Sequence, residues 1–79
     1  MGVLQRVRKH LEEARRQGRP FTLAWDTALR TVVLPIRDPA DRRTWLNALD
    51  ETSDAWMRAY EGWEEPVNVD ALMQLEGSQ

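Results

Sequence analysis

A single apolar stripe in the second half of the chain constrains the fold more than any other feature. Its members follow one another at steps of four, three, four, three and four residues, the spacing of side chains on one face of an α-helix. They are Trp45, Leu49, Thr52, Trp56, Ala59 and Trp63. We therefore predict one long helix from Pro39 to about Glu61, with three indoles on one face.

The start of this long helix carries the clearest capping signal in the chain. Asp38 suits the N-cap position, Pro39 the first helical position, and Asp41 places a negative charge in the first turn. Gly62 is expected to end the helix. At about 1.5 Å per residue the helix would span roughly 35 Å, so two shorter helices could pack along it.

Residues 3–17 show the same kind of periodicity. The apolar positions that recur at three- and four-residue steps are Leu4, Val7, Leu11 and Ala14. Gly18 is suited to the C′ position after a helix, and Pro20 prevents the helix from continuing. We therefore predict a first helix over residues 3–17.

Residues 21–34 fit two local structures. A helix over 22–33 would have Thr22 as its N-cap, and it would place on one face Phe21, Trp25, Ala28 and Val32. Alternatively, the alternation in 21–25 and the β-branched residues in 31–34 would form a hairpin. That hairpin would have to turn at residues 26–27, which lack the Gly that tight turns favour. We prefer the helix, with the hairpin left open.

The last segment predicts a short helix over 69–76. Asn68 would cap it, and its apolar content is Leu72, Met73 and Leu75. Such a short helix is marginal in water by itself, so it must dock on its own domain or on a partner. The predicted architecture is a single small helical domain over 1–79. It is an all-α three-helix bundle built on a long third helix, with a short C-terminal helix.

The composition limits the class of protein. A chain of 79 residues with 42% hydrophobic residues and a net charge of −2 belongs with small folded domains. It has no Cys, so disulfides and thiolate metal sites cannot stabilise its thin core. A homodimer would supply additional burial. The sequence has no membrane-spanning apolar run and no secretory signal, so we expect a cytoplasmic protein without a membrane partner.

Two aromatic-rich runs resemble a known group of proteins. Residues 18–29 contain Gly, Pro-Phe, Ala-Trp and Ala-Leu, and residues 45–62 contain Trp, Ala-Leu, Thr, Trp and Ala-Tyr. Over about residues 18–62 the chain resembles small uncharacterised helical proteins of high-GC bacteria and their prophages. Ten of its eleven basic residues are Arg, which fits GC-rich codons. The resemblance implies two helices and a mobile-element origin, and it brings no assigned activity.

The sequence contains no catalytic signature. His10 is the single His, and no ligands are spaced with it to form a metal site, so we interpret it as a residue at the border of the apolar face. Asp50, Glu51 and Asp54 form an acidic cluster that is expected to face water. We therefore predict that the protein is not an enzyme, with no catalytic, cofactor-binding or metal-binding residues and no cofactor.

The main functional hypothesis is protein interaction. Trp63 follows the helix end at Gly62 and lies beside acidic residues, so it is the Trp expected to be most exposed. An exposed Trp surrounded by charge is typical of an interface anchor. The candidate protein-interaction residues are Trp63, Tyr60, Met57, Asp50 and Asp54. We expect an accessory factor of a phage or mobile element that binds a host or phage protein.

Two alternatives rest on charge. The first is nucleic-acid binding through cations that could lie along phosphates. These nucleic-acid candidates are Arg6, Arg8, Lys9, Arg15, Arg16 and Arg19. The second is a structural subunit that assembles with itself. Residues 1–43 carry ten basic and five acidic side chains, a balance of +5, whereas residues 44–79 carry one basic and eight acidic, a balance of −7.

Overall fold

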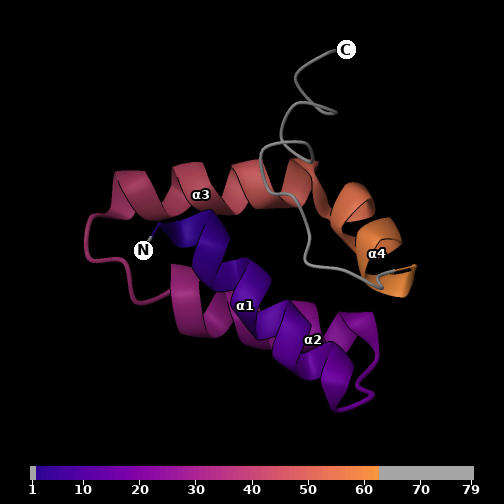
Figure 1. Cartoon of the computed structure of the whole chain (residues 1–79). Helices are drawn as coiled ribbons and strands as arrows, with labels where there is room; N and C mark the ends of the chain where they lie inside the picture. Colours follow the sequence, from indigo (N-terminus) through magenta and orange to yellow (C-terminus); the bar gives the residue numbers. More distant parts are fainter. Residues whose placement is uncertain (1, 63–79) are drawn as a thin grey trace.

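The computed structural model describes residues 2–62 and confirms the all-α class, since no strand occurs among those residues. In chain order the elements are α1 (Val3–Arg16), α2 (Phe21–Ala28), the π-helical turn η1 (Leu29–Val33), α3 (Pro39–Glu51) and α4 (Ser53–Glu61). Helices α1 and α2 lie side by side, α3 crosses above them, and α4 turns back toward the start of α2 (Figure 1). The predicted helix over 69–76 and Trp63 lie outside the described residues.

Helix α1 ends almost where the sequence predicts. The Gly18 N–H donates to the Arg15 carbonyl oxygen and the Arg19 N–H to the Ala14 carbonyl oxygen, each at 3.0 Å. This pair of bonds is the Schellman motif, which satisfies carbonyls at a helix end. It requires a left-handed residue at C′, and Gly18 has a φ of 74°. The C′ assignment of Gly18 is thus confirmed.

Replacing Gly18 by Ala is expected to lower the free energy of unfolding by about 1–2 kcal/mol, because an L side chain is strained at positive φ. The midpoint of urea unfolding, followed by far-UV circular dichroism, measures the loss. Gly62→Ala is the matched control, since Gly62 has a φ of −97° and its new Cβ would lie 3.7 Å from the Arg58 carbonyl oxygen, an ordinary contact. Equal midpoints for the two variants would contradict the strain argument.

Residues 21–33 form one continuous helical segment, so the helix is confirmed over the hairpin. The predicted N-cap Thr22 is wrong. The helix begins at Phe21 with Pro20 in the N-cap position, and no side chain caps it. Pro20 is held in an extended conformation by its ring and has no N–H to satisfy, which places Thr22 inside the first turn.

The π-helical turn η1 ends this segment. The Leu34 N–H reaches back five residues to the Leu29 carbonyl oxygen at 3.1 Å. Both Val32 and Val33 are fully buried there, although the predicted regular helix placed only Val32 on its inner face. Leu34 stands between this turn and Pro35 and keeps an α conformation, with a φ of −59° and a ψ of −32°.

The single long helix predicted over 39–61 is wrong, because the chain divides at Thr52 into α3 and α4. Thr52 has a φ of −102° and a ψ of 6°. Its hydroxyl donates to the Ala48 carbonyl oxygen at 3.0 Å or the Leu49 carbonyl oxygen at 3.2 Å, and it accepts the Trp56 Nε1–H at 3.1 Å. A Thr side chain that bonds to the preceding turn in this way bends a helix.

The start of α3 confirms the capping prediction. The Asp38 Oδ1 accepts the Ala40 N–H at 3.1 Å, Pro39 opens the helix, and Asp41 lies in the first turn. Along the predicted stripe Leu49, Thr52 and Trp56 are buried, whereas Trp45 and Ala59 are half-buried. The stripe therefore faces the core on both sides of the Thr52 break.

The core joins all the helical segments through small aliphatic residues and a series of aromatic rings. Its buried apolar residues are Val7, Leu11, Ala14, Ala24, Ala28, Val32, Val33, Leu49, Ala55, Trp56 and Tyr60. Phe21 stacks on Trp25 at 5.4 Å between ring centroids and meets Tyr60 edge-on at 5.5 Å. Trp25 lies 5.9 Å from Trp56. These rings link α2 to α4 and determine which face of α4 turns outward.

Candidate functional site

Tyr60 belongs to the core, although it was expected on an exposed interaction face. It is 5% exposed. Its hydroxyl donates to the Arg19 carbonyl oxygen at 2.5 Å, which ties α4 to the connection between α1 and α2. Burial raises the pKa of the Tyr60 phenol, and this effect outweighs the opposing influence of Arg15 and Arg19. Its burial follows from its packing against Phe21, and this removes it from the interaction face.

Replacing Tyr60 by Phe is expected to cost about 1 kcal/mol of unfolding free energy near neutral pH, because one hydrogen bond is lost. The wild-type advantage should shrink as the pH rises above 10.0, the ordinary Tyr pKa. There the unfolded phenol loses its proton while the folded phenol, whose pKa is higher, retains it. Urea unfolding of both proteins from neutral to alkaline pH measures the difference. A constant difference would contradict this account.

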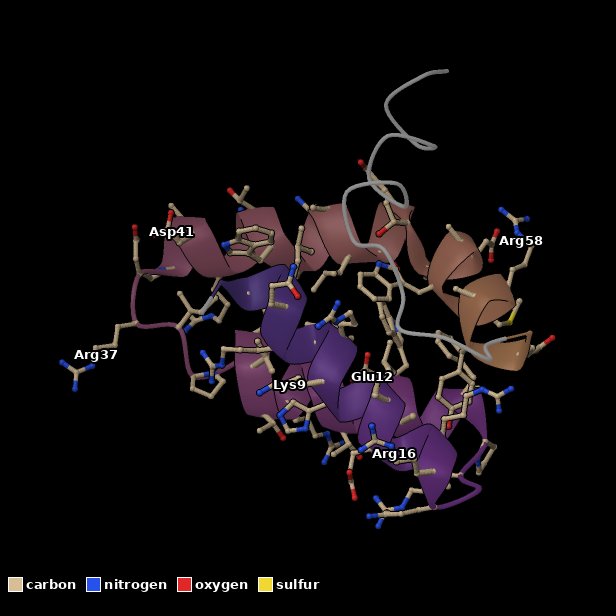
Figure 2. All side chains as sticks on the ribbon, viewed as in Figure 1. Lys9, Glu12, Arg16, Arg37, Asp41 and Arg58 are labelled. Carbon is tan, nitrogen blue, oxygen red and sulfur yellow. The ribbon has the colours of Figure 1, made fainter. Side chains whose placement is uncertain are left out.

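The remaining candidates on α3 and α4 lie on the outward surface. The predicted candidates Asp50 at the end of α3 and Asp54 and Met57 on α4 are exposed, and so is Glu61 on α4, which was not among the candidates. We call these four residues the acidic α4 face. The opposite side of α4 is buried through Ala55, Trp56 and Tyr60. Arg58 lies beside the acidic α4 face and projects away from the helical body (Figure 2).

Three of the predicted nucleic-acid candidates are exposed on the outer side of α1, namely Arg6, Lys9 and Arg16. We call these three residues the basic α1 face, and Figure 2 shows two of them, Lys9 and Arg16, along the helix. A shallow surface groove is lined by Arg6, Lys9, His10, Glu12, Glu13 and Arg16. His10 is half-buried, as its interpretation as a border residue requires.

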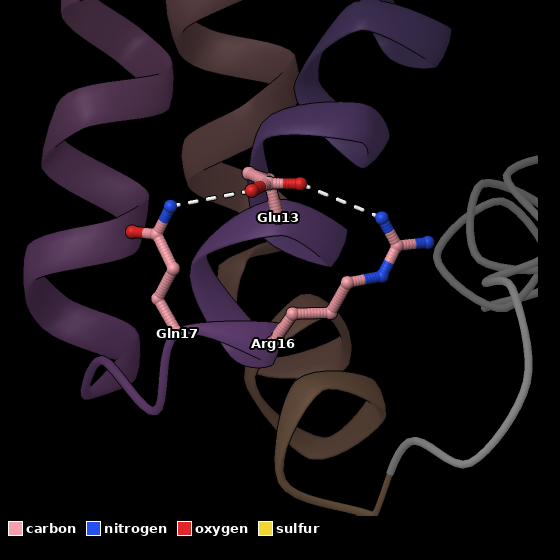
Figure 3. Close-up of polar contacts among 3 residues, drawn as sticks. All are labelled: Glu13, Arg16 and Gln17. Carbon is pink, nitrogen blue, oxygen red and sulfur yellow. Dashed lines mark hydrogen bonds and ion pairs between the residues drawn. The ribbon is translucent and has the colours of Figure 1, made fainter.

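Glu13 lies within this basic surface and is held by its neighbours. Its carboxylate accepts from the Gln17 amide at 3.2 Å and from Arg16 at 3.4 Å (Figure 3). These contacts are exposed and local to the end of α1. The Glu13 carboxylate reduces the positive charge of the basic α1 face. Arg6 and Lys9 lie on the N-terminal side of Glu13, and Arg16 lies on its C-terminal side.

The other nucleic-acid candidates are placed differently. Arg8 is half-buried and pairs with Glu12 at 3.6 Å. Arg15 donates to the Glu61 carbonyl oxygen at 3.4 Å, and its guanidinium lies 6.0 Å from the centre of the Tyr60 ring. Arg19 is exposed at the turn after α1. The structure therefore does not bring all six cations onto one face. Arg15 contacts α4, and Arg8 pairs with its neighbour Glu12 on α1.

Two exposed apolar side chains were missed by sequence reasoning. Leu23 is 59% exposed on α2 and Leu34 is 49% exposed just after η1. Both lie off the face formed by Phe21, Trp25 and Ala28, and this position in the sequence could have indicated that they are exposed. Scattered single apolar residues are common on protein surfaces, so neither defines a site by itself.

Residues 2–62 contain no group of three or more His, Cys, Asp or Glu side chains that could hold a metal ion. No helix in that range combines the length and apolarity needed to cross a bilayer.

Comparison of the chain with protein-family models, with curated proteins and with solved structures finds no match. The two charged faces are the features of the fold from which a function can be inferred.

Proposed function

We propose that this protein is a non-enzymatic protein-interaction module that binds a basic protein surface through its acidic α4 face. The observation that carries the proposal is the two-sided construction of α4. Trp56 and Tyr60 anchor one side in the core, so the other side presents its charges from a fixed helix. Such preorganisation reduces the entropy that binding must overcome.

The chemistry of the acidic α4 face favours a basic and partly apolar partner. Asp50, Asp54 and Glu61 provide carboxylates, which steer a cationic surface toward the site and select against acidic ones. Met57, 36% exposed, adds a flexible thioether that adapts to an apolar contact. An accessory factor that captures a host or phage protein would use a surface of this kind.

The test is a pull-down with tagged full-length protein from lysate of its own host, with and without nuclease. The wild type should retain one dominant protein after nuclease treatment, and Asp54→Lys/Glu61→Lys should lose it. Lys9→Glu/Arg16→Glu is the matched control, because it reverses two exposed charges outside the acidic α4 face and should retain the partner. Circular dichroism verifies that each variant folds. Equal capture by the wild type and the α4 variant would refute the proposal.

A second candidate function is nucleic-acid binding through the basic α1 face, favoured by the groove along Arg6, Lys9 and Arg16. Glu13 within this surface and the net charge of −2 weaken the attraction for phosphates. This function predicts that recovery in the pull-down collapses on nuclease treatment. It also predicts that binding to a short DNA duplex weakens steeply with salt and fails in Lys9→Glu/Arg16→Glu.

A further inference from the structure

We propose that the basic α1 face of one copy binds the acidic α4 face of a second copy, so that the protein associates head to tail. This inference rests on the proposed function, since it uses the same acidic α4 face and identifies its partner as another copy of the chain.

Basic and acidic side chains are segregated along the part of the chain that the structure describes. Residues 1–43 carry ten basic and five acidic side chains, whereas residues 44–62 carry one basic and four acidic. Three ion pairs within residues 2–62 are local. They join residues three or four positions apart, namely Arg8 with Glu12, Arg16 with Glu13, and Arg30 with Asp26. Arg16 is engaged by Glu13 through an exposed pair at 3.4 Å, and such pairs are individually weak, so a carboxylate of a second copy can compete for this cation.

The orientation of the helices separates the two faces. Where α1 approaches α4, the contact is made by Arg15, through the Glu61 carbonyl oxygen and the Tyr60 ring. Lys9 and Arg16 lie farther round α1, on its exposed side. Figure 2 shows these two residues on α1 and Arg58 projecting outward from α4. The hydrogen bond and ring contact between α1 and α4 within one copy thus come from Arg15, which is not a member of the basic α1 face.

The spacing of charges on the two faces matches. Lys9 and Arg16 are seven residues apart on α1, and Asp54 and Glu61 are seven residues apart on α4. Seven helical residues rise about 10 Å, so two helices laid side by side can pair both ends at once. Met57 lies between the two carboxylates and would cover the aliphatic stems of the basic side chains. The complementary spacing favours a second copy over an arbitrary basic surface.

A contact between two different faces of the same protein predicts open assemblies. Each copy would use a different face on each side, which is a heterologous interface that forms chains unless its rotation closes a ring. Exposed ion pairs are individually weak and are screened by salt. The association should therefore appear at high protein concentration and low ionic strength.

Sedimentation velocity of the full chain tests the proposal. The weight-average mass should rise with protein concentration at low salt and return to that of a single chain at about 0.5 M NaCl, where charges are screened within a few ångströms. Lys9→Glu/Arg16→Glu and Asp54→Lys/Glu61→Lys should each remain monomeric. An equimolar mixture should regain association, because the reversed α1 face of one variant complements the reversed α4 face of the other.

Matched controls use the exposed residues Arg37 and Asp41 at the start of α3 (Figure 2). Arg37→Glu and Asp41→Lys change charge away from both faces and should associate like the wild type. A wild-type mass independent of concentration would overturn the proposal. So would association that survives both double variants, or a mixture that fails to recover.

The outcome also separates this inference from the proposed function. If the wild type is monomeric while Asp54→Lys/Glu61→Lys still abolishes capture of a lysate protein, only the head-to-tail assembly fails. The opposite outcome is that the mixture of the two double variants associates while Asp54→Lys/Glu61→Lys captures the lysate protein as well as the wild type does. That outcome supports the head-to-tail assembly and contradicts binding of a different protein through the acidic α4 face.

Discussion

Replacing Trp56 by Ala is expected to leave much of the protein unfolded at room temperature. Trp56 is fully buried, its ring lies 5.9 Å from Trp25, and its Nε1–H donates to Thr52. Truncating a buried Trp to Ala costs about 3–5 kcal/mol. A domain of this length has a total stability of only about 4–12 kcal/mol, at roughly 0.05–0.15 kcal/mol per residue. One substitution therefore removes a large fraction of the total.

Far-UV circular dichroism and urea unfolding measure this loss. Trp45→Ala is the matched control, because Trp45 belongs to the same stripe but is only half-buried, so its midpoint should fall by less than half as much. Trp56→Phe keeps an aromatic ring and removes the Nε1–H. Its urea midpoint should therefore lie between those of the wild type and Trp56→Ala. If Trp45→Ala and Trp56→Ala shifted the midpoint equally, the central role of Trp56 would be disproved.

Replacing Leu49 by Ala is expected to cost about 2–5 kcal/mol and to loosen α3 first. Leu49 is the sole fully buried residue of α3, whereas the other apolar side chains of that helix retain some exposure. Helix α3 therefore depends on this residue for its attachment to the body. Removing its side chain leaves a cavity that the crossing helix cannot easily fill.

Amide hydrogen exchange distinguishes this local effect from global unfolding. In Leu49→Ala the amides of α3 should exchange faster relative to those of α1 than in the wild type. Leu46→Ala is the control, since Leu46 is half-buried on the same helix and should reduce stability by a smaller amount. A uniform increase in exchange across α1 and α3 would show that α3 does not open separately.

The two charged faces can be altered with little effect on the core. Lys9 and Arg16 on α1, and Asp54 and Glu61 on α4, are exposed, and each lies opposite the buried side of its helix. Surface substitutions change stability by about 0.5 kcal/mol or less, and loss of the exposed Arg16–Glu13 pair adds only a small further cost. Effects of charge reversal on binding or assembly will consequently report on the faces themselves.

The helix-end signals could be predicted from sequence because they act locally. Asp38 caps α3 through the N–H two residues away, and Gly18 ends α1 through bonds within six residues. The periodicity of Val7, Leu11 and Ala14 likewise identified the buried side of α1. For the interaction face, the exposure of Asp50, Asp54 and Met57 agrees with the interpretation of a solvated acidic surface.

The main errors arose at Thr52, through local side-chain bonds, and at Tyr60, through tertiary packing. Thr52 fits the apolar stripe by spacing, but its hydroxyl bonds back to the preceding turn and accepts from Trp56, so α3 and α4 are separate helices. Tyr60 fits an exposed interaction face in sequence, but its packing against Phe21 and its bond to Arg19 bury it.

The amino-acid sequence by itself determined the helical class, the ends of α1, the start of α3 and the apolar sides of α1 and α3. These properties depend on residues within one or two helical turns, whose capping and periodicity operate without the rest of the chain. The break at Thr52 and the π-helical turn appeared only in the structure, because they arise from bonds within five residues that apolar spacing does not reveal. Tertiary packing decided the burial of Tyr60 and the inward placement of Arg15, because residues distant in sequence supply those contacts.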